Sequence, residues 1–281
     1  MRVDLVLPND LPYCAALMPR CGEFEAMGFD GLWFTDHIVG YEKHKPVHDM
    51  HWLEATSVLA YAVALTNNIR LGVGVLVLPY RDAVLTAKML STLDVLSGGR
   101  IDLGVGTGWA LPEFYALGRE RLYARRGAYT DEALEVMLAC WSAENGLEFD
   151  GEFQRFRNAR MSPRPVQQPR IPLWIGARGI AARAPLRRAA KYADYWHPTG
   201  LSPAELRASG EHLSTVAGRE IPTSIRARID STASLAEMQD WLGGYNEVGC
   251  AEAAIDVRSP DSTTFMRDAG RLANALKSLR K

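Results

Sequence analysis

The chain has 281 residues, of which 47% are hydrophobic, so it can bury a complete core, and about 250 residues is a usual size for one strand-helix barrel. Its 32 lysine and arginine residues balance 33 aspartate and glutamate residues, which argues against nucleic acid or an anionic membrane as a partner and favours a small molecule. No apolar run approaches the roughly 18 residues of a membrane span, and the four cysteines have no zinc-binding spacing, so we expect a cytoplasmic protein with free thiols.

The first half of the chain alternates predicted strands with predicted helices. An apolar run over residues 3–7 predicts a strand, and a helical pattern follows from about residue 13 to residue 27, where Gly28 predicts a C-terminal cap. The alternation then continues with strands at 31–35, 69–75 and 101–105 and with helices at 53–66, 82–96 and about 127–141. The strands are nearly continuous apolar runs, which is typical of parallel strands that are covered on both faces.

The second half repeats this alternation after an insertion. Residues 147–156, with a turn at Asp150-Gly151, predict a small surface hairpin, and later strands are expected at 173–176, 194–197, 224–229 and 253–257. About eight strand-helix pairs close a parallel barrel, so we predict one (β/α)8 TIM barrel domain over residues 1–281 with a small β-hairpin insertion. An open doubly wound sheet agrees less well, because the first strand is followed by Pro8-Asn9-Asp10 and not by a glycine-rich turn.

The second predicted strand ends in Asp36-His37, which is where a barrel enzyme places catalytic groups. A histidine there can exchange protons near neutral pH, and a neighbouring carboxylate can hold its tautomer and ring orientation. From position alone, a second interpretation stays open, in which His37 is a polar residue of the barrel rim without a chemical role.

Glycines mark the ends of three further predicted strands, at Gly72 and Gly74, at Gly104, Gly106 and Gly108, and at Gly176 and Gly179. Each group has two interpretations. The backbone approaches a flat ring or a phosphate there, or the glycine makes room for a large neighbour or caps a helix. The next strand ends in Trp196-His197, whose rings either line a ring-binding pocket or fill the core.

A cluster of histidines near the second strand raises a metal-dependent hydrolase as an alternative of another class; its members are His37, His44, His48 and His51. Two of them stand three residues apart, a spacing that shares a metal on a helix. Pro46 disfavours a helix before them, and barrel metal sites collect ligands from several strand ends, so we predict no metal site.

Three segments together carry a resemblance to a known family. They are "GFDGLWFTDHI", "IRLGVGVLVLPYRDAVLTAKMLSTLDVLSGGRIDLGVGTGW" and "PLWIGARGIAARAPLRRAAKYADYWHP". The chain closely resembles the luciferase-like monooxygenase superfamily, and within it the branch that uses coenzyme F420, a 5-deazaflavin. The resemblance covers most of the first 200 residues and then thins.

The resemblance implies where the cofactor lies. Asp36 and His37 would stand beside the flavin-type ring, with His37 as proton donor or acceptor and Asp36 behind it. Gly74-Val75 matches the position of a cis peptide that supports the ring. The remaining implied contacts are to the ring and its side chain from Gly106, Thr107 and Gly108, and to the phosphate from Gly176, Ala177 and Arg178.

The chain departs from the sugar-phosphate dehydrogenases of that branch at two places. Trp109 stands where those enzymes have a glutamate, with Glu113 further along, and Tyr41 stands where they place a tryptophan. An apolar Trp109 favours a less polar substrate than a sugar phosphate. We assign Tyr41, Trp109 and Trp196 to the substrate side of the site.

The resemblance therefore implies an F420-dependent oxidoreductase that moves a hydride between C5 of the deazaflavin and a small organic substrate, while His37 handles the proton. An FMN-dependent monooxygenase that takes reduced flavin and oxygen is the alternative on the same barrel, because the cofactor and not the fold decides the reaction. A barrel that only binds a partner is a weaker alternative. By resemblance we also expect a homodimer.

Overall fold

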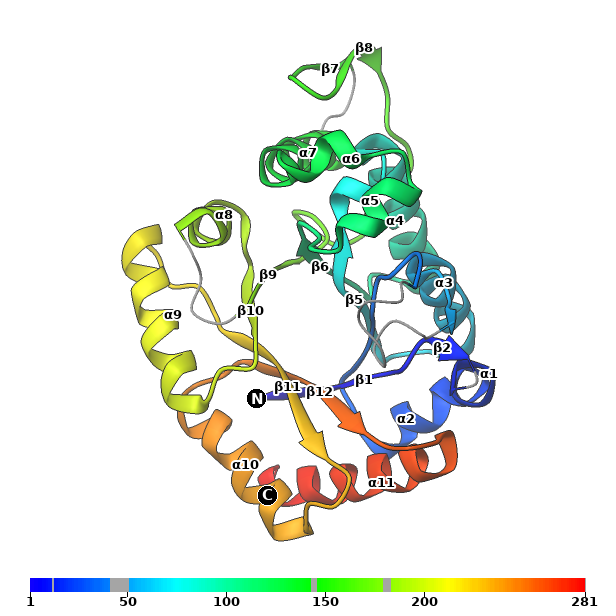
Figure 1. Cartoon of the computed structure of the whole chain (residues 1–281), viewed down its shortest axis with the longest axis vertical. Coiled ribbons are helices and arrows are strands. Elements are labelled where there is room, and N and C mark those ends of the chain that lie inside the picture. The colour runs from blue at the N-terminus through cyan, green and yellow to red at the C-terminus, as the bar shows by residue number, and fades with distance from the viewer. Residues whose placement is uncertain (12, 41–50, 143–145, 179–182, 281) are drawn as a thin grey trace.

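A computed structural model of the chain describes residues 1–11, 13–40, 51–142, 146–178 and 183–280 (Figure 1). Its strands form a closed parallel barrel in the order β1-β12-β11-β10-β9-β6-β5-β3, which confirms the predicted (β/α)8 fold. The barrel strands are β1 (Arg2–Val6), β3 (Gly31–Phe34), β5 (Arg70–Val77), β6 (Ile101–Gly106), β9 (Leu173–Arg178), β10 (Tyr195–Thr199), β11 (Ser224–Asp230) and β12 (Glu252–Arg258).

Helices alternate with these strands and cover the outside of the barrel. They are α2 (Cys21–Met27), α3 (Ala55–Leu65), α4 (Ala83–Ser97), α7 (Arg126–Ser142), α8 (Arg183–Tyr192), α9 (Pro203–Ala217), α10 (Leu235–Glu247) and α11 (Ser262–Leu279). Gly28 ends α2 in the left-handed region at φ 96°, as predicted from its position. Serine capping boxes begin α9 and α10.

The helix predicted over residues 13–27 is broken. It consists of α1 (Tyr13–Leu17), a 3-10 turn η1 (Met18–Arg20) and α2, because Pro19 cannot donate the backbone hydrogen bond that a continuous helix needs. Between β6 and α7, where the sequence predicted no element, the structure has two short helices, α5 (Leu111–Ala116) and α6 (Glu120–Tyr123).

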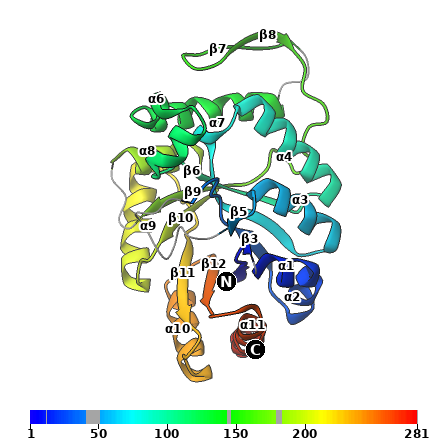
Figure 2. The same cartoon turned by 45° about the vertical axis from the view of Figure 1, so that its right-hand side comes forward.

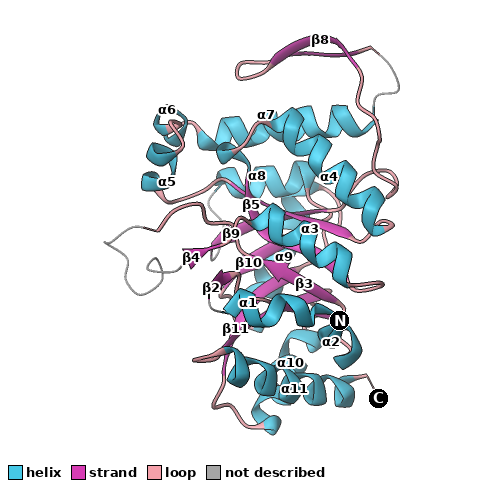
Figure 3. Ribbon diagram, turned by 90° about the vertical axis from the view of Figure 1, so that its right-hand side faces the viewer, coloured by secondary structure: helices cyan, strands magenta, loops and turns pink. Residues whose placement is uncertain are grey.

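Two small sheets accompany the barrel. The predicted hairpin is confirmed as β7 (Leu147–Asp150) and β8 (Arg155–Ala159), which stand apart from the barrel beyond α7 (Figure 2). The other pairs β2 (Asp10–Leu11) with β4 (His51–Trp52). Together with α5 and α6, this sheet lies at the end of the barrel opposite the two chain termini (Figure 3).

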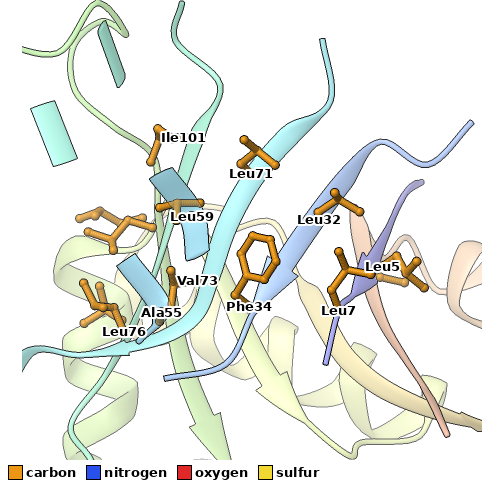
Figure 4. Close-up of a cluster of buried hydrophobic side chains, with 14 of the residues drawn as sticks. Leu5, Leu7, Leu32, Phe34, Ala55, Leu59, Leu71, Val73, Leu76 and Ile101 are labelled. Atoms are coloured by element: carbon orange, nitrogen blue, oxygen red, sulfur yellow. The ribbon is translucent and has the colours of Figure 1, made fainter. Parts of the chain in front are cut away.

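Side chains that alternate outward from the strands pack against the helices. Figure 4 shows part of this core, where strand side chains and α3 form one cluster; β1, β3, β5 and β6 contribute Leu5, Leu32, Leu71 and Ile101, and α3 contributes Leu59. None of these five side chains is exposed. At about 1.5–3 kcal/mol for each buried leucine or isoleucine, this layer is a principal source of stability.

The inside of the barrel is filled by aromatic rings packed against glycine. A Cβ atom at Gly72 or Gly74 would lie 2.7 or 2.9 Å from the indole of Trp33, so glycine makes room for this ring. Its Nε1 donates to Asp4 at 2.6 Å. The sequence left open whether a ligand approaches the backbone at these two glycines. The indole of Trp33, a core side chain, occupies that space.

A charged network closes the barrel at the amino ends of the strands. We call it the floor, and it consists of Arg2, Asp4, Asp102 and Glu252. Arg2 donates to Asp4 and to Asp102, each at 2.7 Å, and its guanidinium lies 2.6 Å from Glu252. The three carboxylates are almost completely buried. Burial raises the pKa of Glu252 well above its ordinary value, and the neighbouring Asp4 adds to that shift while Arg2 opposes it.

Across the described parts of the chain, none of the helices combines the length and the apolar character that crossing a membrane requires.

Candidate active site

The carboxyl ends of the barrel strands carry the predicted site, and we call this end the mouth. Asp36 and His37 follow β3 here and face opposite ways, as consecutive residues of an extended segment do. The side chain of His37 keeps 12% exposure, whereas Asp36 is 3% exposed. His37 therefore faces the mouth and Asp36 faces the packed layer behind it.

Asp36 is an anchor and does not orient the histidine, which corrects the predicted role. Its two carboxylate oxygens accept from Arg81 at 2.6 and 2.7 Å, and one of them also accepts from the amide of Val77 at 2.8 Å. Burial raises the pKa of Asp36, and Arg81 opposes that shift. Both carboxylate oxygens of Asp36 are thus bound by groups of the chain itself. The bonds of Asp36 to Arg81 and Val77 connect the end of β3 to the end of β5.

Glu113 is the carboxylate that holds His37, and sequence reasoning gave it no role. Its Oε2 lies 3.3 Å from Nδ1 of His37 and accepts from the hydroxyl of Tyr80 at 2.8 Å, while Oε1 accepts from the amide of Ile38 at 2.6 Å. Glu113 is 1% exposed, in the first turn of α5. Desolvation acts to raise its pKa, but the bonds from His37, Ile38 and Tyr80 outweigh that effect and lower it.

Two tryptophans flank the imidazole ring of His37. The centroid of the Trp52 ring lies 4.9 Å from that of His37, and the Trp109 ring meets it edge-on at 6.2 Å. Trp109 is 56% exposed, consistent with a wall open to solvent. Trp52, on β4, was not predicted, because an isolated two-residue strand gives no periodic signal. Tyr41 lies outside the described residues.

The Gly74-Val75 peptide bond is cis, as the resemblance implies. The pairing of β5 with β6 shifts register between Val73 and Leu76, so the chain bulges at this point. A Cβ at Gly176 would lie 2.8 Å from the side chain of Val75, and Gly106 faces that side chain too. Gly106 and Gly176 therefore leave room for the side chain of Val75 inside the barrel. This packing explains glycine at both positions in a way that the predicted cofactor contact did not include.

The other predicted residues fall in three places. Gly108 has φ +75°, a left-handed conformation that favours glycine, and with Thr107 it lies half-buried in the turn after β6. Ala177 is also half-buried, near the end of β9, which Arg178 terminates; the side chain of Arg178 and residue 179 lie outside the described parts. Trp196 lies elsewhere.

The assignment of Trp196 to the substrate was wrong. Its side chain is completely buried in the core cluster between strands and helices. Strand alternation sends Trp196 outward and His197 inward, where the imidazole stacks on Trp33 with ring centroids 5.4 Å apart.

Within the described residues, no group of three or more histidine, cysteine, aspartate or glutamate side chains is arranged to hold a metal ion. His44 and His48, on which the metal hypothesis depended, lie outside those residues, and His51 is exposed on β4.

Comparison with known sequences decides the family. The sequence profile of luciferase-like monooxygenases matches residues 15–276, nearly the whole chain. The chain belongs to the luciferase-like monooxygenase family.

Relatives of this luciferase-like protein include two monooxygenases. The pyrimidine monooxygenase RutA of Yersinia enterocolitica is 33% identical over 199 residues, which cover 66% of this chain and 52% of that protein. An FMNH2-dependent dimethylsulfone monooxygenase of Pseudomonas putida is 29% identical over 161 residues, or 57% of this chain and 43% of that enzyme. The chain spans about half the length of the curated relatives it matches.

Solved structures share the luciferase-like barrel over its full length. An F420-dependent secondary alcohol dehydrogenase in complex with an F420-acetone adduct superposes with a TM-score of 0.84 at 16% identity, covering 100% of this chain and 99% of that one. A coenzyme F420-dependent tetrahydromethanopterin reductase from Methanopyrus kandleri superposes with a TM-score of 0.76 at 16% identity, with the same coverage. At these identities the likeness shows the fold.

The mouth of this luciferase-like barrel has the chemistry that a flat, partly polar ring requires. Val75 offers a half-buried apolar side chain at the bulge, and Thr107 and Ala177 are small residues at neighbouring strand ends. A guanidinium, that of Arg226, reaches the same level inside the barrel and donates to the carbonyl of Gly74. Apolar support with one cationic donor fits a flavin or a deazaflavin.

Proposed function

We propose that this protein is an F420-dependent oxidoreductase that transfers a hydride to or from a small organic substrate, with His37 as the proton donor or acceptor. The observation that carries this proposal is the imidazole of His37, which faces the mouth and lies against Glu113, just after the strand that pairs with the cis Gly74-Val75 bulge strand. The two solved structures compared above are F420-dependent enzymes, which supports this cofactor as the first to test.

The state of Glu113 defines what His37 can do. A carboxylate with a lowered pKa is ionised at neutral pH and can only accept hydrogen bonds. Nδ1 of His37 therefore carries a hydrogen toward Glu113 whether the ring is neutral or charged. We assign Nε2 as the ring atom that exchanges the proton with the substrate in this proposal, as a general acid or base requires.

The cofactor would lie between this histidine and the bulge. When bound, F420 supplies a carbon, C5, that gives or takes a hydride. Gly74 and Val75 would support its ring, with further contacts to the ring from Gly106, Thr107 and Gly108 and to the phosphate from Gly176, Ala177 and Arg178. The contribution of the chain is orientation, together with the proton at Nε2 of His37.

The walls of the mouth favour a substrate of low polarity. Trp52 and Trp109 present aromatic surface on two sides of His37. The charged side chains nearest to His37 have partners within the chain, because Asp36 binds Arg81 and Glu113 lies against His37. A small alcohol or carbonyl compound suits such walls better than a sugar phosphate, whose phosphate would need cationic partners.

An FMN-dependent monooxygenase is the second candidate. The name of the dimethylsulfone monooxygenase states its dependence on FMNH2, and RutA is named a monooxygenase. In that case the same mouth would hold reduced flavin, and the substrate would be oxidised with oxygen. His37 would again be the proton-exchanging group beside the ring.

Titration of the purified protein with F420 and with FMN, followed by cofactor fluorescence, separates the two candidates. We expect saturable quenching or enhancement with F420 and a much weaker response with FMN. Anaerobic mixing of loaded protein with small secondary alcohols should then reduce F420 without oxygen consumption. Binding of FMN with none of F420 would replace the first proposal by the second.

A further inference from the structure

Arg226 crosses the inside of the barrel just below the mouth. It stands on β11, and its guanidinium reaches the opposite side, where Nη1 donates to the carbonyl of Gly74 at 2.5 Å and Nη2 to the hydroxyl of Thr35 at 3.1 Å. Gly74 is the first residue of the cis bulge, and Thr35 directly precedes Asp36. The guanidinium thus lies under the place proposed for the ring.

The positive charge of Arg226 is only partly neutralised. Asp256 is its ion-pair partner, but Nη2 and Oδ2 are 3.8 Å apart. The same oxygen receives a closer bond from Arg228 at 2.9 Å, so one carboxylate serves two cations. The guanidinium stays charged because arginine does not lose its proton in proteins, and burial without a close counter-ion is unfavourable.

Arg226 also has donors to spare. A guanidinium has five N–H groups, and the described contacts of Arg226 use one at Gly74 and one at Thr35. Its side chain keeps 18% exposure, so the guanidinium is not sealed from solvent. A cation with unused donors near the carboxyl ends of the barrel strands is suited to receive an anionic or electron-rich group.

We propose that Arg226 is the residue that binds the electron-rich edge of the reduced cofactor and so sets the balance between its reduced and oxidised forms. This inference rests on the proposed function. Reduction places negative charge on the pyrimidine edge of a deazaflavin or flavin ring, so a nearby cation stabilises the reduced form more than the oxidised form. The contact with Gly74 makes Arg226 part of the support of the ring as well.

The decisive measurement is the ratio of two dissociation constants, for reduced and for oxidised F420, in anaerobic fluorescence titrations. Arg226→Gln keeps a hydrogen-bonding side chain and removes the charge. We expect it to weaken binding of reduced F420 about tenfold more than binding of oxidised F420, which lowers the potential of the bound two-electron couple by about 30 mV. Arg226→Lys should restore much of the ratio.

Two further variants keep the test sharp. Asp256→Asn leaves Arg226 in place with less counter-charge, so the ratio of dissociation constants should move in the direction opposite to that of Arg226→Gln. This variant provides the test if Arg226→Gln does not fold. Arg258→Gln is the matched control, because it removes the same charge from an exposed side chain at the end of β12, where water screens it, and leaves Asp256 and Arg228 in place. Its ratio should stay close to that of the unmodified protein.

The outcomes separate this inference from the proposed function. Equal weakening of both redox forms in Arg226→Gln, or an Asp256→Asn ratio that moves in the same direction, reduces Arg226 to a support of the bulge and overturns the inference. If the unmodified protein binds FMN instead of F420, the proposed cofactor fails, and the same ratios measured with FMN test Arg226. If it binds neither, both proposals fail.

Discussion

Two histidines of this barrel, His37 and His197, lie near strand ends and have opposite surroundings. His37 is open to the mouth and faces the carboxylate of Glu113. His197 is 2% exposed inside the barrel, where Nδ1 lies 2.7 Å from the hydroxyl of Ser224. Burial lowers the pKa of His197 to about 3, and the positive charge of Arg226 adds to that shift.

Under the proposed function, the difference separates a residue for chemistry from a residue for packing. A proton-exchanging group must reach solvent or substrate in both protonation states, and His37 has an anion beside it that accommodates a charged ring. His197 has arginines on its two sides, Arg226 above and Arg2 toward the floor, so it stays neutral. Barrels of this type commonly divide chemistry at the mouth from stability below it.

The strongest test of this comparison is removal of the histidine at the mouth. His37→Ala should lower turnover at least about 10²-fold, because a positioned general acid or base contributes about that much. Binding of F420 and the melting temperature should be largely kept, since the ring is partly exposed. Single-turnover reduction of bound F420 measures the effect.

His197→Gln is the matched control for that variant. It should leave turnover largely unchanged and lower the unfolding free energy by about 1–3 kcal/mol, because Ser224 loses one of its two buried partners and keeps only Glu252. Equal losses of turnover in the two variants would erase the distinction between the two histidines.

The second test uses pH. The pKa of His197 is about 3 in the folded protein and near 6.5 in an unfolded chain, so between these values the unfolded chain binds more protons. The unfolding free energy should therefore fall as the pH is lowered below about 6.5, with a contribution approaching 1.4 kcal/mol per pH unit, about one proton. Urea unfolding at several pH values measures this, and the slope should be shallower in His197→Gln. Identical slopes would show that His197 is not the titrating group.

The barrel itself was predictable because its signals are local. Apolar runs, helix periodicity and Gly28 at the end of α2 lie within single segments, and each predicts an element without knowledge of its neighbours. Pro19 was an equally local signal that the prediction of one helix over residues 13–27 neglected.

The site was less predictable because its decisive contacts are not local. Glu113 contacts His37 although 76 positions of sequence separate them, whereas Asp36 directly precedes His37 and faces the other way. Adjacency in an extended segment argues against contact, since side chains alternate between faces. The same alternation separates Trp196 from His197, but which of the two faces inward follows only from the pairing of β10 with β9.

The smallest expected effect sharpens the comparison most, because it tests the partner of His37 and leaves the histidine in place. Glu113→Gln keeps the size of the side chain and removes its charge, so it can still accept a hydrogen bond from His37 without compensating a charged ring. We expect turnover to fall about tenfold with the KM of substrate nearly unchanged, which is the pattern of an interaction made in the transition state.

Tyr80→Phe is the control, because it removes the other hydrogen bond to the same oxygen of Glu113 and leaves His37 untouched. Its turnover should fall much less than that of Glu113→Gln. In addition, 15N spectra of labelled histidine should place the hydrogen of neutral His37 on Nδ1 in the unmodified protein, with His37→Ala identifying the signal. A hydrogen on Nε2 would mean that Glu113 is not an ionised acceptor, and the mouth would lose the feature that distinguishes its histidine from the one below.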